Sequence, residues 1–251
     1  MKHSPLSVDW VREAAFEELL HLADQRFGVR FEPVKIGAYT LDILQFADLE
    51  EYIDRLAEST REEQRLQLPF WAKIWPTSIL LSYSLQKLTP DPKLRVLEIG
   101  AGVGVCGLFA AKHGFQVTIS DNEPEALLFA RISILQNSLQ DRASVALADF
   151  TKDRLEQRFS LILGSEVLYR ETDYRPLIKF LQRHLQPGPE AAVMLAKDYK
   201  LAAKKFFKLA EPEFSWQEKT LGYREQSSRG NDSEDRHLCT IYTLTPKKCS
   251  A

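Results

Sequence analysis

The spacing of hydrophobic positions divides the chain into an irregular first part and a regular second part. The elements expected in the first part are a helix over 7–27, a strand over 39–46 and a helix over 48–58. Gly28 suits the C-terminal end of the first helix, and Asp48 suits the N-cap of the second. The charged stretch 59–67 is typical of a solvated helix end or a linker. We therefore treat residues 1–65 as an N-terminal extension of helices and a strand, and 66–251 as the main domain.

From Leu68 onward, apolar runs typical of strands alternate with helical patterns. The expected strands are 95–100, 116–121, 144–150, 161–169, 191–199 and 237–245, and the expected helices are 104–113, 124–137 and 174–185. This alternation predicts an α/β, Rossmann-like fold with a mostly parallel sheet covered by helices on both faces. The last strand follows a hairpin-like loop, 223–237, that leaves no room for a standard helix. It is therefore expected to be the one antiparallel strand.

The strongest local motif is "VLEIGAGVGVCG", residues 96–107. Gly100, Gly102 and Gly104 follow a buried strand and open a helix, so the backbone can turn tightly and approach a ligand closely. The alternative is a tight turn without a ligand, but three glycines in five residues exceed what such a turn needs. Glu98, near the end of the strand, is expected to face a cationic ligand.

Two cofactors can be weighed against this loop. Residues 102–107 satisfy the dinucleotide pattern G-x-G-x-x-G, and Asp121 follows at about the offset of a ribose-binding acid, which leaves NAD open. However, the glycine loop begins at Gly100, directly after the strand, and Glu98 suits a cation better than a pyrophosphate. S-adenosylmethionine (SAM) carries a sulfonium and an ammonium group and no phosphate. The pattern therefore favours SAM.

Further acids and aromatic residues stand where the remaining parts of such a ligand would lie. Asp121 can accept hydrogen bonds from ribose hydroxyls, or alternatively cap the helix that follows. Asp149 can bond an adenine amino group while Phe150 covers the base, although Phe150 can equally be a core residue. Upstream, we expect Trp71 to be a packing residue or a pocket residue with equal weight, and Trp75 to form a wall of the cofactor pocket.

Composition limits the partners and the compartment. The 251 residues carry 33 Lys and Arg against 35 Asp and Glu, a balance that disfavours a nucleic-acid partner. The three cysteines lie far apart without a CxxC pair, so we expect a reducing, cytoplasmic location and no metal site. There is no apolar run long enough for a bilayer and no signal-peptide pattern. We expect a soluble monomer without membrane partners.

Several segments together resemble a known family. "FWAKIWPTS", "VLEIGAGVG", "SDNEPEAL", "ADF" and "LILGSEVLY" are similar, in order and spacing, to motifs of the seven-stranded SAM-dependent methyltransferases. More narrowly, they resemble the lysine methyltransferase group called methyltransferase family 16. The resemblance covers about residues 65–245 and implies a seven-stranded sheet, SAM as the cofactor, and a protein substrate that bears a target lysine.

The resemblance also implies site residues. Its Trp-Pro segment falls on Trp75 and Pro76, and its glycine loop, motif acid and ribose acid fall on the residues named above. Its Asp-Trp pair becomes Asp149-Phe150 in this chain. The Asp-x-x-Tyr motif becomes Glu166 to Tyr169, which lengthens the acid by one methylene. Ser165, directly before this motif, is counted among the expected cofactor-binding residues.

Glu166 and Tyr169 are the expected catalytic residues. A lysine amine has a pKa near ~10.4, so at pH 7 only about one in ~10³ is neutral, and a carboxylate beside the cofactor can hold the incoming ammonium and orient its lone pair. Alternatively, Glu166 interacts with the dipole of the next helix, and Tyr169 only packs. A basic amphipathic helix over 197–210 is expected to form a solvated face or a substrate-docking surface.

The expected function is SAM-dependent methylation of a lysine side chain in a protein. The alternatives are a methyltransferase of a small molecule or RNA, and a SAM-binding protein that has lost turnover because of the glutamate at position 166.

Overall fold

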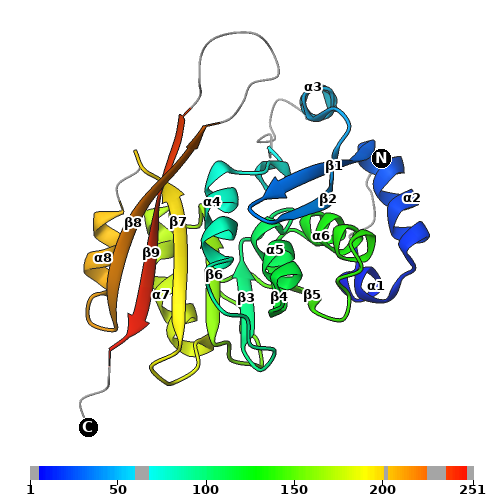
Figure 1. Ribbon diagram of the computed structural model, residues 1–251. Coiled ribbons are helices and arrows are strands. Elements are labelled where there is room, and N and C mark those ends of the chain that lie inside the picture. The colour runs from blue at the N-terminus through cyan, green and yellow to red at the C-terminus, as the bar shows by residue number, and fades with distance from the viewer. Residues whose placement is uncertain (1–5, 60–67, 201–202, 225–235, 248–251) are drawn as a thin grey trace.

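The computed structural model describes residues 6–59, 68–200, 203–224 and 236–247 (Figure 1). Its helices are α1 (Val8–Glu13), α2 (Phe16–Phe27), α3 (Leu49–Ser59), α4 (Pro76–Leu85), α5 (Val105–His113), α6 (Pro124–Gln136), α7 (Tyr174–His184) and α8 (Lys204–Ala210), with 3-10 turns at Phe70–Ala72 and Glu171–Asp173. Its strands are β1 (Val29–Ile36), β2 (Tyr39–Phe46), β3 (Arg95–Ile99), β4 (Gln116–Asp121), β5 (Ala143–Leu147), β6 (Leu161–Ser165), β7 (Ala192–Asp198), β8 (Phe214–Arg224) and β9 (Arg236–Pro246).

The main sheet has seven strands in the order β5-β4-β3-β6-β7-β9-β8. Strands β3 to β7 pair in parallel, whereas β9 pairs antiparallel with both β7 and β8. The predicted mostly parallel sheet with one antiparallel strand is thus confirmed. Strand β8 was not predicted, because its sequence, FSWQEKTLGYR, is too polar to stand out as an apolar run. Much of the predicted connecting loop, at 225–235, lies outside the described residues.

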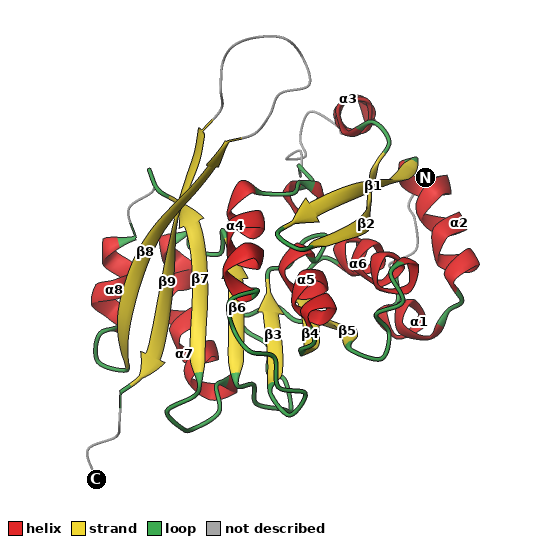
Figure 2. Cartoon of the chain, in the orientation of Figure 1, coloured by secondary structure: helices red, strands yellow, loops and turns green. Residues whose placement is uncertain are grey.

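Helices cover both faces of this sheet, as Figure 2 shows. Alternating side chains of each strand enter two separate cores, as the pleat requires. In β7, Met194 and Ala196 join the core that also holds α4, α5 and α6. Val193 and Leu195 join the core formed with α7 and α8. Among the described residues, no helix is both long and apolar enough to cross a membrane.

The N-terminal part packs directly on the main domain. The hairpin of β1 and β2 lies against α6, where the backbone of Asp42 exchanges hydrogen bonds of 3.0 and 2.8 Å with the Asn137 side chain. The rings of Phe46 and Trp71 lie 5.2 and 5.1 Å from the ring of Phe129, measured between centroids. The division at residue 65 stays a prediction, but the parts on its two sides share one hydrophobic core.

The predicted elements of the N-terminal part need two corrections. The helix expected over 7–27 is two helices, since Ala14 and Ala15 adopt extended backbone angles between α1 and α2. Strand β1 was missed because it contains Pro33, a residue that argues against a strand. The predicted caps are confirmed: Gly28 ends α2 with φ +62°, and the Asp48 carboxylate accepts a hydrogen bond of 2.9 Å from the Glu51 N–H. Most of the expected linker lies outside the described residues.

Three predicted elements of the main domain are shorter than expected. The strand expected over 144–150 ends at Leu147, and the one expected over 161–169 ends at Ser165. Candidate site residues beyond these two ends therefore lie in loops at the carboxyl edge of the sheet. The basic helix expected over 197–210 is α8 alone, which begins at Lys204. Lys197 belongs to β7, within the strand expected over 191–199.

Candidate active site

The loop after β3 requires its glycines. Gly100, Gly102 and Gly104 have φ angles of +56°, +54° and +81°, which side chains rarely adopt. A Cβ on Gly102 would lie 2.6 Å from the backbone oxygen of Trp71, and one on Gly100 would lie 3.0 Å from Cγ1 of Val167. The loop is therefore in close contact with the segment before α4 on one side and with the loop after β6 on the other.

Asp121 fixes the glycine loop to the end of β4. Its Oδ2 accepts a hydrogen bond of 2.8 Å from the Gly102 N–H, and its Oδ1 accepts one of 3.0 Å from the Glu123 N–H. Burial raises the pKa of the Asp121 carboxyl group. Each carboxylate oxygen can accept a further hydrogen bond, so the side chain keeps capacity for a ligand. The N-cap of α6 is Glu123, so Asp121 is not itself the cap that the alternative interpretation required.

Glu98 is held by the beginning of α5. Its Oε2 accepts a hydrogen bond of 2.7 Å from the Gly107 N–H, and its Oε1 accepts one of 3.2 Å from the Cys106 N–H. Burial raises the pKa of Glu98 to about 8. These bonds give Glu98 a structural role in seating α5 against β3. Its direct contact with a ligand stays a prediction.

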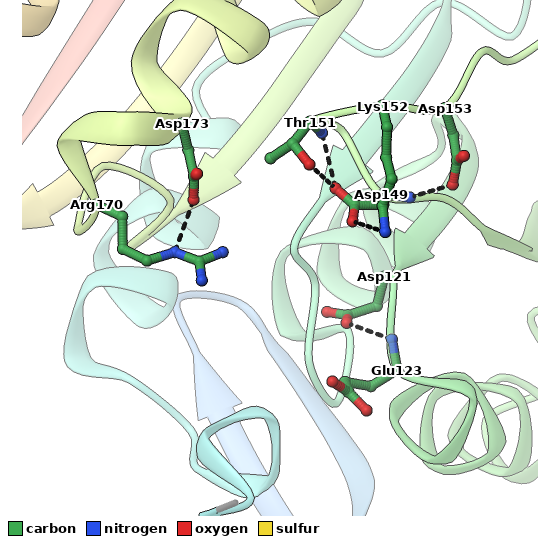
Figure 3. A network of polar contacts seen from close by, with 8 residues as sticks. All are labelled: Asp121, Glu123, Asp149, Thr151, Lys152, Asp153, Arg170 and Asp173. Carbon is green, nitrogen blue, oxygen red and sulfur yellow. Dashed lines mark hydrogen bonds and ion pairs between the residues drawn. The ribbon is translucent and has the colours of Figure 1, made fainter.

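Asp149 and Phe150 lie in the loop after β5. Figure 3 shows Asp149 beside Asp121. Oδ1 of Asp149 accepts hydrogen bonds of 2.8 and 2.5 Å from the N–H and hydroxyl of Thr151, and Oδ2 forms an ion pair of 3.0 Å with Lys152. Burial alone would raise the pKa of Asp149, but these partners lower it. Cε1 of Phe150 lies 3.7 Å from the position of a Cβ on Gly100. The aromatic ring thus stands beside the glycine loop.

Glu166 turns the chain sharply after β6. Its φ is +55°, and its N–H donates a hydrogen bond of 2.9 Å to the Ala196 oxygen. Its Oε1 accepts one of 2.8 Å from the Asp198 N–H at the end of β7, and the Thr77 hydroxyl donates to the same carboxylate. Burial raises the pKa of Glu166. A half-buried carboxylate is thereby fixed at the carboxyl edge of the sheet.

Tyr169 stands apart from this arrangement. Its side chain is 65% exposed, and the guanidinium carbon of Arg170 lies 5.3 Å from its ring centroid. Arg170 also forms an ion pair of 2.7 Å with Asp173, and Figure 3 shows its guanidinium group on the side of Asp149. Among the described residues, the hydrogen-bond partners of Glu166 come from α4 and β7, not from Tyr169. A catalytic role for Tyr169 stays a prediction.

The Trp-Pro segment leads into α4 beside the same edge. Trp75 is the residue before α4, and its Nε1 donates a hydrogen bond of 3.3 Å to the Phe70 oxygen. Trp71 packs in the aromatic cluster described above, so its packing role is confirmed. Thr77, which follows Pro76, brings its Oγ1 to 2.8 Å from Oγ of Ser165.

Sequence reasoning missed three residues of this site: Thr77, Lys197 and Asp198. Thr77 occupies the variable position of the W-P-x-S element, where no residue type is expected. Lys197 interrupts an apolar strand at a position that points inward by alternation, and this was a usable signal. Asp198 contributes its backbone N–H to the Glu166 carboxylate, and a backbone contact leaves no sequence signal.

A sequence model of the family described as lysine methyltransferase matches residues 59–213 of the chain. The chain belongs to the lysine methyltransferase family. The match includes the glycine loop, Asp121, Asp149 and the segment with Glu166. The predicted family is confirmed.

Curated relatives share this region. Protein N-lysine methyltransferase METTL21A of Danio rerio is 34% identical over 130 residues, which cover 49% of this chain and 59% of that protein. Histone-arginine methyltransferase METTL23 of Mus musculus is 30% identical over 143 residues, covering 55% and 56%. EEF1A lysine methyltransferase 3 of Mus musculus is 29% identical over 172 residues, covering 66% and 72%. The chain thus spans less than two thirds of the length of the first two relatives.

Solved structures share the fold at low sequence identity. A SAM-dependent methyltransferase from Agrobacterium tumefaciens aligns with a TM-score of 0.57 and 16% identity, covering 86% of this chain and 70% of that one. A putative RNA methyltransferase from Pyrococcus horikoshii aligns with a TM-score of 0.54 and 16% identity, covering 79% and 98%. At this identity the likeness establishes the methyltransferase fold alone.

Proposed function

We propose that this chain is a SAM-dependent methyltransferase that acts on a lysine side chain of a protein substrate. The observation that carries the proposal is the contact between two loops at the carboxyl edge of the sheet. Cγ1 of Val167, the residue directly after Glu166, lies 3.0 Å from the position of a Cβ on Gly100 in the glycine loop. A carboxylate suited to an amine therefore lies beside a loop suited to a cofactor, and open α/β sheets bind ligands at this edge.

The chemistry of the residues around the glycine loop fits SAM. The carboxylates of Asp121 and Asp149 create a negative potential that suits a cation and would oppose a pyrophosphate. Asp121 would accept hydrogen bonds from the ribose hydroxyls, and Phe150 would cover the adenine. Trp75 and Ser165 would line the same pocket. This assignment of residues to parts of the cofactor belongs to the proposal.

Bound SAM would supply a methyl group made electrophilic by its sulfonium. The residues of the chain have a different task, because the lysine acceptor arrives almost entirely as an ammonium, which has no free lone pair. Glu166 would bind this ammonium as its counter-ion and orient it, and the ammonium would release one proton to solvent to free the lone pair that takes the methyl group. The Asp198 N–H and the Thr77 hydroxyl hold the carboxylate in position before the acceptor binds, and such preorganisation favours reaction.

The partner in this proposal is a protein, and the compartment is the cytoplasm, where the free thiols of Cys106 and Cys239 stay reduced. Of the three relatives described above, two are named as lysine methyltransferases and one as a histone-arginine methyltransferase. The acceptor amino acid is therefore the first point to test.

The test incubates the purified chain with methyl-labelled SAM and a cell lysate. Proteins are then separated from RNA and metabolites, and the labelled fraction is hydrolysed to amino acids. We expect the label in N-methylated lysine. Label in methylarginine would show that the acceptor is arginine and not lysine. Label in RNA or metabolites alone would refute a protein substrate. An absence of SAM binding by calorimetry would refute the whole proposal.

Glu166→Gln is the matched variant for this assay, because it keeps the shape of the side chain and removes its charge. We expect transfer to fall by at least about 10²-fold, the scale of a positioned acid–base group, while the SAM dissociation constant changes by less than about twofold. Undiminished transfer would show that Glu166 only shapes the turn after β6.

A further inference from the structure

Lys197 is a buried lysine at the end of β7. Its side chain is 2% exposed, although lysine is almost never fully buried unless its charge is paired. Alternation along the strand puts it on the same face as Val193 and Leu195, which belong to the core formed with α7 and α8. A leucine or valine would suit that environment. The cost of burying an ammonium there indicates that the charge has a use.

The backbone of Asp198 connects Lys197 to Glu166. The Lys197 ammonium donates a hydrogen bond of 3.0 Å to the Asp198 oxygen. The N–H of the same residue donates one of 2.8 Å to Oε1 of Glu166. One residue of the chain is therefore held from both sides, by an ammonium from within the core and by a carboxylate from the carboxyl edge.

We propose that Lys197 is a positioning residue for Glu166: its buried ammonium fixes the backbone at Asp198, to which Glu166 is bonded, and supplies the positive charge that faces this carboxylate from inside the fold. The inference rests on the proposed function, in which Glu166 binds the acceptor ammonium. No residue of the expected site had this role, because Lys197 was expected only as part of a strand and of a basic segment that forms a solvated face or a substrate-docking surface.

The groups around Glu166 support this role. Thr77 approaches from α4, Asp198 and Lys197 from β7, and Cys239 from β9. Burial raises the pKa of Cys239 to about 12, with the two carboxylates adding to the effect, so that thiol is neutral. Among the described residues that influence the charge of Glu166, Lys197 is therefore the one that carries a positive charge.

The charges of Lys197 and Glu166 support one another. Burial raises the pKa of Glu166, which favours its neutral form, and the ammonium of Lys197 opposes this effect. Burial lowers the pKa of Lys197, and the carboxylates of Glu166 and Asp198 oppose that effect in turn. A neutral Glu166 would lose its attraction for an ammonium. Lys197 thus widens the pH range in which Glu166 can bind a cationic acceptor.

The experiment follows the ionisation of Glu166 without any substrate. In protein labelled with ¹³C at the glutamate carboxyl carbons, Glu166→Gln assigns the Glu166 signal, and a pH titration gives its midpoint. The amide proton of Asp198, which donates to this carboxylate, reports the same titration independently. Calorimetry with SAM is run on every variant.

Three substitutions separate charge from packing. We expect an upward shift of the Glu166 midpoint in Lys197→Met and in Lys197→Gln, the latter keeping a donor for the Asp198 oxygen. Lys197→Arg should return the midpoint toward that of the wild type. Lys208→Met is the matched control, since it removes one charge from the exposed face of α8. Its midpoint should equal that of the wild type.

The proposal is overturned if Lys197→Gln leaves both probes at the wild-type midpoint, or if Lys208→Met shifts them equally. Should Lys197→Met not fold, the Gln and Arg variants decide the outcome alone. SAM affinity should change by less than about twofold throughout, because Lys197 lies outside the cofactor residues. A chain that transfers no methyl group would refute the proposed function, while the titration would still test the pairing of Lys197 with Glu166.

Discussion

Replacing Gly102 by alanine tests how the glycine loop is built. The residue has a φ of +54°, and a non-glycine residue in this region costs about 1–2 kcal/mol. The added Cβ would lie 2.6 Å from the backbone oxygen of Trp71, closer than real Cβ atoms approach. This oxygen cannot withdraw easily, because the Trp71 ring is packed against Phe129 and Phe46.

Relief of this contact requires a backbone shift, and overpacking of this kind costs about 1–3 kcal/mol. The free energy of unfolding should therefore fall by about 2–5 kcal/mol in Gly102→Ala when the strained φ is included. Gly28→Ala is the matched control, since Gly28 has a φ of +62° and no atom within 4 Å of an added Cβ. It should lose only about 1–2 kcal/mol. The difference between the two variants isolates the contact with Trp71.

Urea unfolding followed by circular dichroism measures both losses. Calorimetry with SAM adds a functional comparison, because the Gly102 N–H is bonded to Asp121, the proposed ribose acid. We expect SAM to bind at least about tenfold more weakly to Gly102→Ala, equivalent to about 1.4 kcal/mol, and with unchanged affinity to Gly28→Ala. Equal losses of stability in the two variants, or equal SAM affinity, would refute this account of the loop.

Two further predictions concern stability. Burial raises the pKa of Glu98 to about 8 from an ordinary value of 4.5, so between these pH values the folded chain keeps a proton that the unfolded chain has lost. Stability should fall as the pH rises through this range, and Glu98→Gln should flatten the fall in urea titrations at several pH values; an identical pH profile would contradict the shift. Phe129→Ala should lower the free energy of unfolding by about 3–5 kcal/mol, since the fully buried ring contacts Phe27, Phe46 and Trp71. Because these rings join the N-terminal part to the main domain, unfolding should stay a single transition, and two separate transitions in urea would show that the parts fold independently.

The sequence predicted the parallel half of the sheet well, because each of those strands is a short apolar run between helices. Strand β8 escaped notice, since one of its faces is solvated and its residues are mostly polar. Strand β1 escaped because Pro33 contradicts strand propensity, although the hairpin with β2 accommodates it. These are positions where tertiary pairing overrides local preference.

For the site, the sequence could identify residue types but not their partners. Asp121 was expected to meet a ligand, and the structure adds that it also binds the glycine loop that it follows by about 20 residues. Glu98 was expected to face a cation, which stays a prediction, and the structure adds that both of its oxygens accept bonds from the start of α5. In both cases the partners are backbone N–H groups, and a sequence does not reveal where such donors point.

The glutamate at position 166 is the clearest example. From the sequence, its extra methylene was a departure from the family motif and put catalysis in doubt. In the structure, the left-handed turn at Glu166 directs the longer side chain across the end of β6 to the Asp198 N–H on β7. An aspartate with the same backbone would be one methylene shorter along that path. The longer side chain thus has a partner on the neighbouring strand, and the same strand also carries the buried Lys197, whose ammonium donates to the Asp198 oxygen. The effect of a changed residue at one motif position therefore depends on the hydrogen-bond partners that the neighbouring strand offers to the new side chain.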